Sequence, residues 1–147
     1  MARSEVDDQL DPIAKYSIFK RAFDTLNSFT SSDNLVGAFV LSFSILEDRM
    51  RAAMVDAFKA IDEPLGTKNV SKIPYARLVS RLKRIHVIDT QLEKRLLEAA
   101  DLRNRLTHQA MWRLDVFSMD HINEFKALIN EVKKAHRSFL RLNKASK

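Results

Sequence analysis

Apolar side chains recur along this chain at steps of three and four residues, the spacing that places them on one face of an α-helix. The first such run follows Asp11 and Pro12, which suit a helix cap and the first helical position. The run extends to about Phe29, so a first helix is expected over this segment. Its apolar positions are Ile13, Tyr16, Phe19, Phe23 and Leu26.

The longest run extends from about Asn34 to Ile61. Its first half, Leu35–Leu46, is apolar nearly all round, which predicts the central and most buried helix. About a dozen apolar residues are too few to cross a bilayer as a helix, so no membrane span is expected. A linker, Glu63–Asn69, follows this second helix.

Three more helices are expected beyond this linker. The third covers about Tyr75 to Ile85, and the fourth begins after the cap residue Asp89. The expected inward positions of the fourth helix are Leu92, Leu96, Leu97, Ala99, Ala100 and Leu106. A connector, Trp112–Met119, carries apolar anchors at Leu114, Val116 and Phe117. The fifth helix then begins at Ser118 or Asp120.

No segment alternates with the period of a β-strand, and the chain contains only two Gly and three Pro. The expected fold class is therefore all-α, an up-and-down bundle of about five helices. The 147 residues suit one domain, expected over residues 12–143. Residues 1–11 lack apolar periodicity and are expected to be disordered, and residues 144–147 form a basic tail.

Composition narrows the class of protein further. The absence of Cys removes disulfides and thiolate chemistry and fits a reducing compartment. The polar start of the chain does not resemble a signal peptide, so a cytoplasmic location is expected. A net charge of +6 favours an anionic partner, although an ordinary solvated basic surface explains it equally well.

A polar cluster lies near the end of the predicted fourth helix, within Ala100–Trp112. Asn104 and His108 are four residues apart and therefore neighbours on a helix. Arg103 and His108 are five apart, so a straight helix would point them about 140° apart. They converge only if the helix ends between them or the long Arg side chain wraps around it. An imidazole that moves protons, an amide that holds its ring and a guanidinium beside phosphorus would form a phosphodiester-cleaving set.

The spacing alone is not diagnostic, because Arg81 and His86 repeat it without the Asn. Glu47 interrupts the apolar second helix, either as an edge position that reaches solvent or as a carboxylate that pairs with Arg103 or orients His108. No His, Asp and Glu cluster has metal-ligand spacing and no Gly-rich loop suits a nucleotide phosphate, so neither a metal nor a cofactor is expected.

Basic residues gather in two further places. A stripe on the third helix, either a nucleic-acid contact or an ordinary solvated face, consists of Arg77, Arg81 and Arg84. The C-terminal stretch Lys126–Lys147 holds seven Lys and Arg residues against Glu131 alone, so it either follows a nucleic-acid backbone or is simply a soluble helix end.

A bundle of this size, with a long apolar second helix and an R-N-x-x-x-H run closing the fourth, resembles the HEPN family. These small helical domains occur in prokaryotic toxins and antiviral systems and in some eukaryotic RNA-processing factors. The resemblance covers about residues 12–143, and its signature is Arg103–His108. In one subset of toxins a Tyr stands two residues beyond the His; Ala110 occupies that position here.

The resemblance implies a metal-independent endoribonuclease that dimerises around two copies of the motif. Arg103, Asn104 and His108 would be catalytic, with Glu47 in support and Arg105 and the third-helix stripe contacting RNA. RNA, a second copy of the chain and an antitoxin or defence-system protein are the implied partners. The alternatives are a non-catalytic HEPN-like regulatory or interaction module, and an unrelated helical binding protein.

Overall fold

The computed structural model describes residues 12–31, 34–110 and 116–145, and in these residues the chain is helical with no β-strand. Its five α-helices are α2 (Pro12–Ser31), α3 (Leu35–Ala60), α4 (Tyr75–Arg84), α5 (Thr90–Gln109) and α6 (Met119–Ala145), with a short 3₁₀ turn at Val70–Lys72. The expected all-α bundle of about five helices is therefore confirmed. Residues 1–11 and Leu114, for which the sequence made predictions, lie outside the described residues. Lys144 was expected in the basic tail but belongs to α6.

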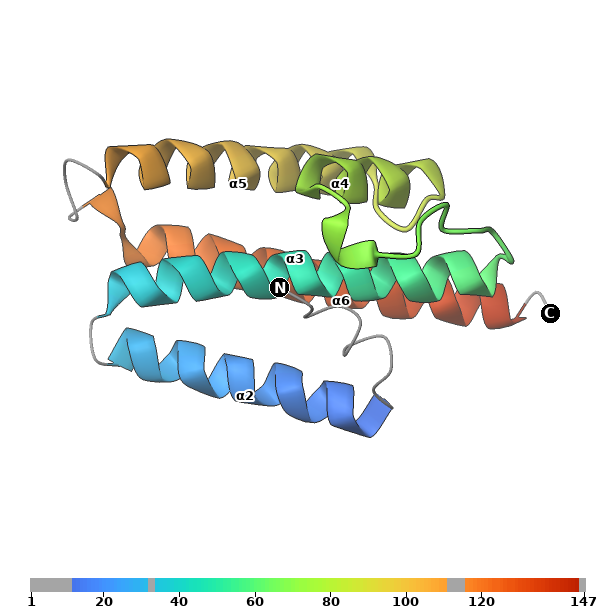
Figure 1. Cartoon of the computed structure of the whole chain (residues 1–147), viewed down its shortest axis with the longest axis horizontal. Helices are drawn as coiled ribbons and strands as arrows, with labels where there is room; N and C mark the ends of the chain where they lie inside the picture. The colour runs from blue at the N-terminus through green and yellow to red at the C-terminus, as the bar shows by residue number, and fades with distance from the viewer. Residues whose placement is uncertain (1–11, 32–33, 111–115, 146–147) are drawn as a thin grey trace.

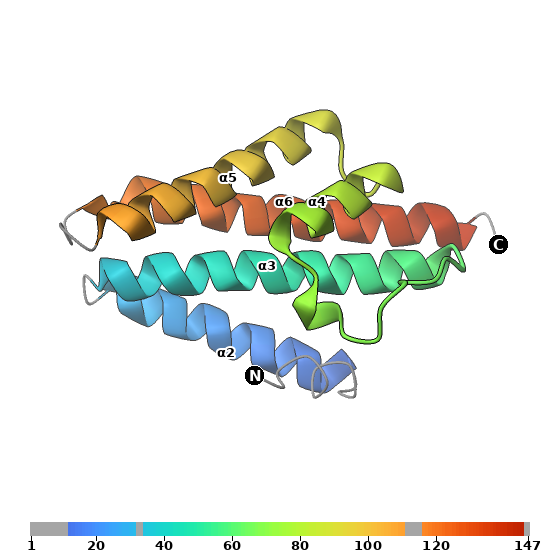
Figure 2. The ribbon, with the colours of Figure 1, turned by 45° about the horizontal axis from the view of Figure 1, so that its top comes forward.

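The long helices alternate in direction along the chain, and α3 and α6 run parallel through the middle of the bundle (Figure 1). Helix α2 covers one side of this central pair, and α4 and α5 lie on the opposite side (Figure 2). The α3–α6 pair forms the most extensive helix contact of the fold. This arrangement explains why both helices bury so many side chains.

Helix α3 is the core helix that its apolar pattern predicts. Its completely buried side chains include Leu46, Met50 and Met54. The side-chain oxygen of Asn34 accepts a hydrogen bond of 3.0 Å from the Gly37 amide, which caps the helix at its predicted start. The Ser42 hydroxyl is also buried, and it donates a hydrogen bond to the Phe39 carbonyl.

The ends of α4 and α5 follow from local chemistry. Asp89 caps α5 by accepting a hydrogen bond of 2.8 Å from the Leu92 amide, as expected. His86 follows the end of α4 with a φ of +66°, a left-handed conformation that commonly terminates helices and that Gly adopts most easily. The α4–α5 turn thus carries an exposed histidine in a conformation that costs some strain.

Candidate functional site

Helix α5 continues without a break through the R-N-x-x-x-H run and ends at Gln109, with Ala110 as its cap residue. The helix therefore does not end between Arg103 and His108. At 100° per residue the two side chains leave the axis about 140° apart. A single copy of the chain does not bring this pair together.

Arg103 lies in the apolar stripe of α5, in line with the buried residues Leu96, Ala99 and Leu106. Its guanidinium carbon lies 4.6 Å from the centre of the Phe43 ring on α3, a cation–π distance. Its Nε atom is buried without a hydrogen-bond partner, and among the described residues no carboxylate pairs with the guanidinium. The cation therefore rests on an aromatic face, and no counter-ion for it lies in the described part of the chain.

Tyr75, the first residue of α4, is buried beside this contact. Its ring stacks on Phe43 with centroids 5.0 Å apart, and its hydroxyl donates a hydrogen bond of 2.7 Å to the Leu96 carbonyl of α5. Burial raises the pKa of the Tyr75 hydroxyl well above its ordinary value; the Glu47 charge raises it further, and Arg103 opposes the rise. Tyr75 thus links α4 to α5 at the place where Arg103 meets α3.

Glu47 is half-buried near this cluster, but its carboxylate pairs with Arg51, one turn later on α3, at 2.9 Å. Arg51 also reaches Asp48 at 3.5 Å and the Ile73 carbonyl at 3.4 Å. The structure contains neither the pairing with Arg103 nor the contact to His108 that the sequence suggested. The charge of Glu47 does affect one neighbour of Arg103, because it raises the pKa of the Tyr75 hydroxyl.

The other polar and charged residues of the motif are exposed. Asn104, Arg105 and His108 face solvent on the side of α5 that points away from the core. Asn104 and His108 are one turn apart, as expected, yet the structure shows no hydrogen bond between the amide and the ring within the described residues. The imidazole is accessible to a substrate or to a second protein surface.

The basic stripe of α4 is partly occupied by contacts within the chain. Arg81 donates a hydrogen bond of 2.9 Å to the Leu65 carbonyl, and Arg84 pairs with Glu63 at 2.5 Å. Arg84 also lies 5.7 Å from the centre of the Phe58 ring. Arg77 is exposed and makes no ion pair among the described residues, so it is the member of the stripe best placed to meet an anion.

Two exposed valines of α3 were not identified as site residues from the sequence. Val36 and Val40 are 40% and 58% exposed, although Leu35–Leu46 was expected to be among the most buried segments. Their spacing places them on the same stripe of α3 as Phe43 and Glu47. The exposed apolar surface therefore lies in line with the ring that carries Arg103. Because they share a stripe of α3 with Phe43, they are candidates for a contact surface that extends from the site.

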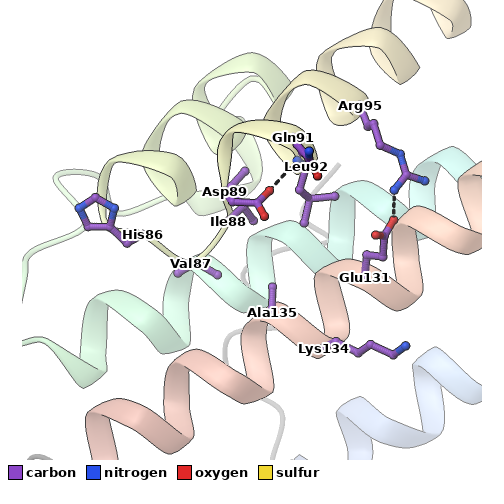
Figure 3. A pocket seen from close by; sticks show the side chains of 10 residues that line it. All are labelled: His86, Val87, Ile88, Asp89, Gln91, Leu92, Arg95, Glu131, Lys134 and Ala135. Carbon is purple, nitrogen blue, oxygen red and sulfur yellow. Dashed lines mark hydrogen bonds and ion pairs between the residues drawn. The ribbon is translucent and has the colours of Figure 1, made fainter.

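A separate pocket of about 480 Å³ lies where the α4–α5 turn and the first turns of α5 meet α6 (Figure 3). Arg95 of α5 reaches across to α6 and pairs there with Glu131 and, at 2.9 Å, with Glu124. The pocket lining contains neither Arg103 nor His108. The candidate site is therefore an open surface of α5 and α3, separate from this pocket.

Among the described residues, no three side chains of His, Asp or Glu gather as metal ligands would. No described helix is both long and apolar enough to span a membrane. Comparison of the chain with family models, with curated proteins and with solved structures finds no match.

Proposed function

We propose that this chain is a metal-independent endoribonuclease of the HEPN type, with an active site formed across a homodimer. The observation that carries the proposal is the half-buried guanidinium of Arg103, which rests on Phe43 and has no carboxylate partner among residues 12–31, 34–110 and 116–145. A cation withdrawn from water without a counter-ion is costly to the fold, and an anionic ligand would offset that cost. A phosphate with developing charge is such a ligand, and a guanidinium can bind it through two parallel hydrogen bonds.

The chemistry uses the 2′-hydroxyl of the RNA as nucleophile. One His108 ring accepts the proton of the 2′-hydroxyl while the 2′-oxygen forms a bond to phosphorus. The bond from phosphorus to the 5′-oxygen breaks, and a second imidazolium gives that oxygen its proton. The products are a 2′,3′-cyclic phosphate and a 5′-hydroxyl end, and Arg103 stabilises the charge on the phosphorane between them.

This scheme needs two imidazoles and at least one guanidinium close to one phosphate. In a single chain, Arg103 and His108 point in different directions from α5. Two copies related by a two-fold axis would supply two motif histidines and could place His108 of one copy opposite Arg103 of the other. The exposed valines Val36 and Val40, in line with Phe43, are the apolar surface that such a contact would bury.

The proposal includes a cytoplasmic role as a toxin or phage-defence effector controlled by a partner protein, which the resemblance to the HEPN family supports. Arg77 and Arg105 are the exposed cations best placed on α4 and α5 to contact the RNA. Asn104 would hold the His108 ring in the assembled site.

A second candidate function is a non-catalytic HEPN-like interaction module. The observation in its favour is that Asn104 does not hold the His108 ring and that Arg103 does not approach it within one chain. In that case Arg103 would bind an acidic group of a partner protein, and no phosphodiester would be cleaved.

The experiment that separates the two is incubation of the purified protein with structured and unstructured RNA in EDTA. The proposed enzyme cleaves both RNAs and produces cyclic-phosphate ends. It does not cleave DNA or 2′-O-methyl RNA, because these lack the 2′-hydroxyl nucleophile. The His108→Ala variant should lose cleavage by at least about 100-fold. Intact RNA after long incubation with the wild-type protein would favour the interaction module.

A further inference from the structure

Most of the cations of α6 lie on a different part of its circumference from its carboxylates, with Lys134 between them. At 100° per residue its three carboxylates, those of Asp120, Glu124 and Glu131, lie about 140–180° around the axis from Lys133. Two of them pair with Arg95 of α5, so this side of α6 faces α5. Four other cations lie within about 80° of Lys133 around the axis. Together with Lys133 they form what we call the α6 basic row: Lys126, Lys133, Arg137, Arg141 and Lys144.

The α6 basic row lies on the side of the helix next to α2. The ammonium group of Lys126 lies 3.5 Å from the Asn27 side-chain oxygen of α2, which fixes this orientation. The row spans about 27 Å at 1.5 Å per residue. Lys133, Arg137, Arg141 and Lys144 make no ion pair with any residue in the described part of the chain. Within residues 12–31, 34–110 and 116–145 their charges therefore have no carboxylate partner.

Arg49 of α3 adds a sixth cation at the centre of the row. Burial and repulsion from Arg137 lower the pKa of Arg49, although Asp56 opposes this effect. The pKa of Lys133 is lowered by burial and by repulsion from Arg49 and Arg137. Asp56 also lies 2.9 Å from the His136 ring, so this carboxylate is shared between Arg49 and His136. The two helices thus hold like charges close together.

We propose that the α6 basic row is a second binding site for the sugar–phosphate backbone of single-stranded RNA, apart from the Arg103–His108 surface. This inference rests on the proposed function, because RNA is the polyanion that the ribonuclease would hold. An extended strand presents a line of phosphates, which a straight row of cations on one helix can follow. The α6 basic row would bind RNA of any sequence. Its members are Lys and Arg residues that would contact phosphates, and phosphate contacts do not distinguish one base from another.

The test measures binding of a short single-stranded 2′-O-methyl RNA by fluorescence anisotropy over a range of salt concentrations. This RNA cannot be cleaved by 2′-hydroxyl attack, so the result does not depend on catalysis. The variant carries Lys133→Gln, Arg137→Gln and Arg141→Gln. Its slope of log affinity against log salt should be shallower by about 2, since each phosphate contact on a single strand contributes about 0.7. The same relation predicts an affinity loss on the order of 100-fold at 0.1 M salt.

The matched control carries Lys68→Gln, Lys72→Gln and Lys94→Gln, which remove the same charge from exposed positions outside the row. It should bind nearly as well as the wild type. Equal losses in the two variants would mean that only net charge matters and would overturn the inference. Binding to anionic phospholipid vesicles without binding to the oligonucleotide would also overturn it. Failure to cleave any RNA would count against the proposed function and leave this binding result unaffected.

Discussion

The guanidinium carbon of Arg103 lies 4.6 Å from the centre of the Phe43 ring, so a charged side chain on the inner face of α5 rests on an aromatic face of α3. Its Nε atom is buried and has no hydrogen-bond partner among the residues that the structure describes. Leucine at this position would continue the apolar stripe of Leu96, Ala99 and Leu106. The fold alone therefore gives no reason for a cation here.

Substitution of Arg103 should separate stability from activity. Arg103→Leu loses a cation–π contact worth about 1 kcal/mol and regains apolar burial, so its free energy of unfolding should stay within about 1 kcal/mol of wild type. RNA cleavage should fall by at least roughly 100-fold, because the phosphorane loses its charge-assisted contact. Urea unfolding and a cleavage assay on the same preparation check both expectations.

Arg103→Lys provides the matching control for charge. An ammonium keeps the positive charge but lacks the planar pair of donors, so it should restore little of the cleavage. A large loss of stability in Arg103→Leu would instead assign the residue a role in the fold. Full activity in either variant would remove Arg103 from the site.

The second prediction concerns assembly through α3. Val40→Glu places a charge in the 58% exposed apolar position in line with Phe43, and it should convert the expected dimer to monomer. Leu142→Glu, at a 72% exposed position near the end of α6, should leave the dimer intact. Sedimentation at micromolar concentration distinguishes the two. A wild-type protein that sediments only as monomer would count heavily against catalysis by a shared site.

The third prediction concerns the buried hydroxyl of Tyr75. Tyr75→Phe keeps the ring on Phe43 but loses the 2.7 Å hydrogen bond to Leu96, so the protein should lose about 1 kcal/mol of stability at neutral pH. Because the folded-state pKa of Tyr75 is raised, the hydroxyl stabilises the fold below its unfolded pKa of about 10, and this contribution is lost as pH rises further.

The stability difference between wild type and Tyr75→Phe should therefore narrow between pH 9 and pH 11, by about 1 kcal/mol. Urea unfolding of both proteins at the two pH values measures it. A difference that stays constant with pH would show that the hydroxyl titrates in the folded protein much as it does in the unfolded chain.

The fourth prediction concerns Asn104. Because its side chain is exposed, Asn104→Ala should leave the melting temperature unchanged. If the amide holds the His108 ring in the assembled dimer, cleavage should fall on the order of 100-fold, since small misplacements of a catalytic group are costly. Cleavage at the wild-type rate would make Asn104 an ordinary surface residue.

The helices could be predicted closely from the sequence because their ends are encoded locally. Asn34 and Asp89 cap the two helices they precede through single hydrogen bonds, and the apolar spacing between caps identifies each helix. The inward position of Leu97 was predicted wrongly, since its side chain is 39% exposed. Leu97 is 100° around the helix from Leu96, and α5 packs on its neighbours along a narrower face than the leucine pattern suggested.

The surroundings of the motif could not be predicted in the same way. Phe43 and Tyr75 meet Arg103 through packing between helices, which periodicity within one helix does not specify. The pairing of Glu47 with Arg51 follows ordinary i, i+4 spacing and prevailed over the longer-range partners considered from the sequence. The divergence of Arg103 and His108 followed from helical geometry once α5 was seen to continue past both residues.

The most direct test of the proposed ribonuclease compares two pairs of residues with the same spacing. Arg103 and His108 belong to the proposed site, whereas Arg81 bonds to the Leu65 carbonyl and His86 lies in the α4–α5 turn. In EDTA, Arg103→Ala and His108→Ala should each reduce RNA cleavage by at least about 100-fold, and Arg81→Ala and His86→Ala should leave the cleavage step nearly intact. Equal losses from both pairs, or cleavage that survives substitution of both Arg103 and His108, would contradict the assignment of the site.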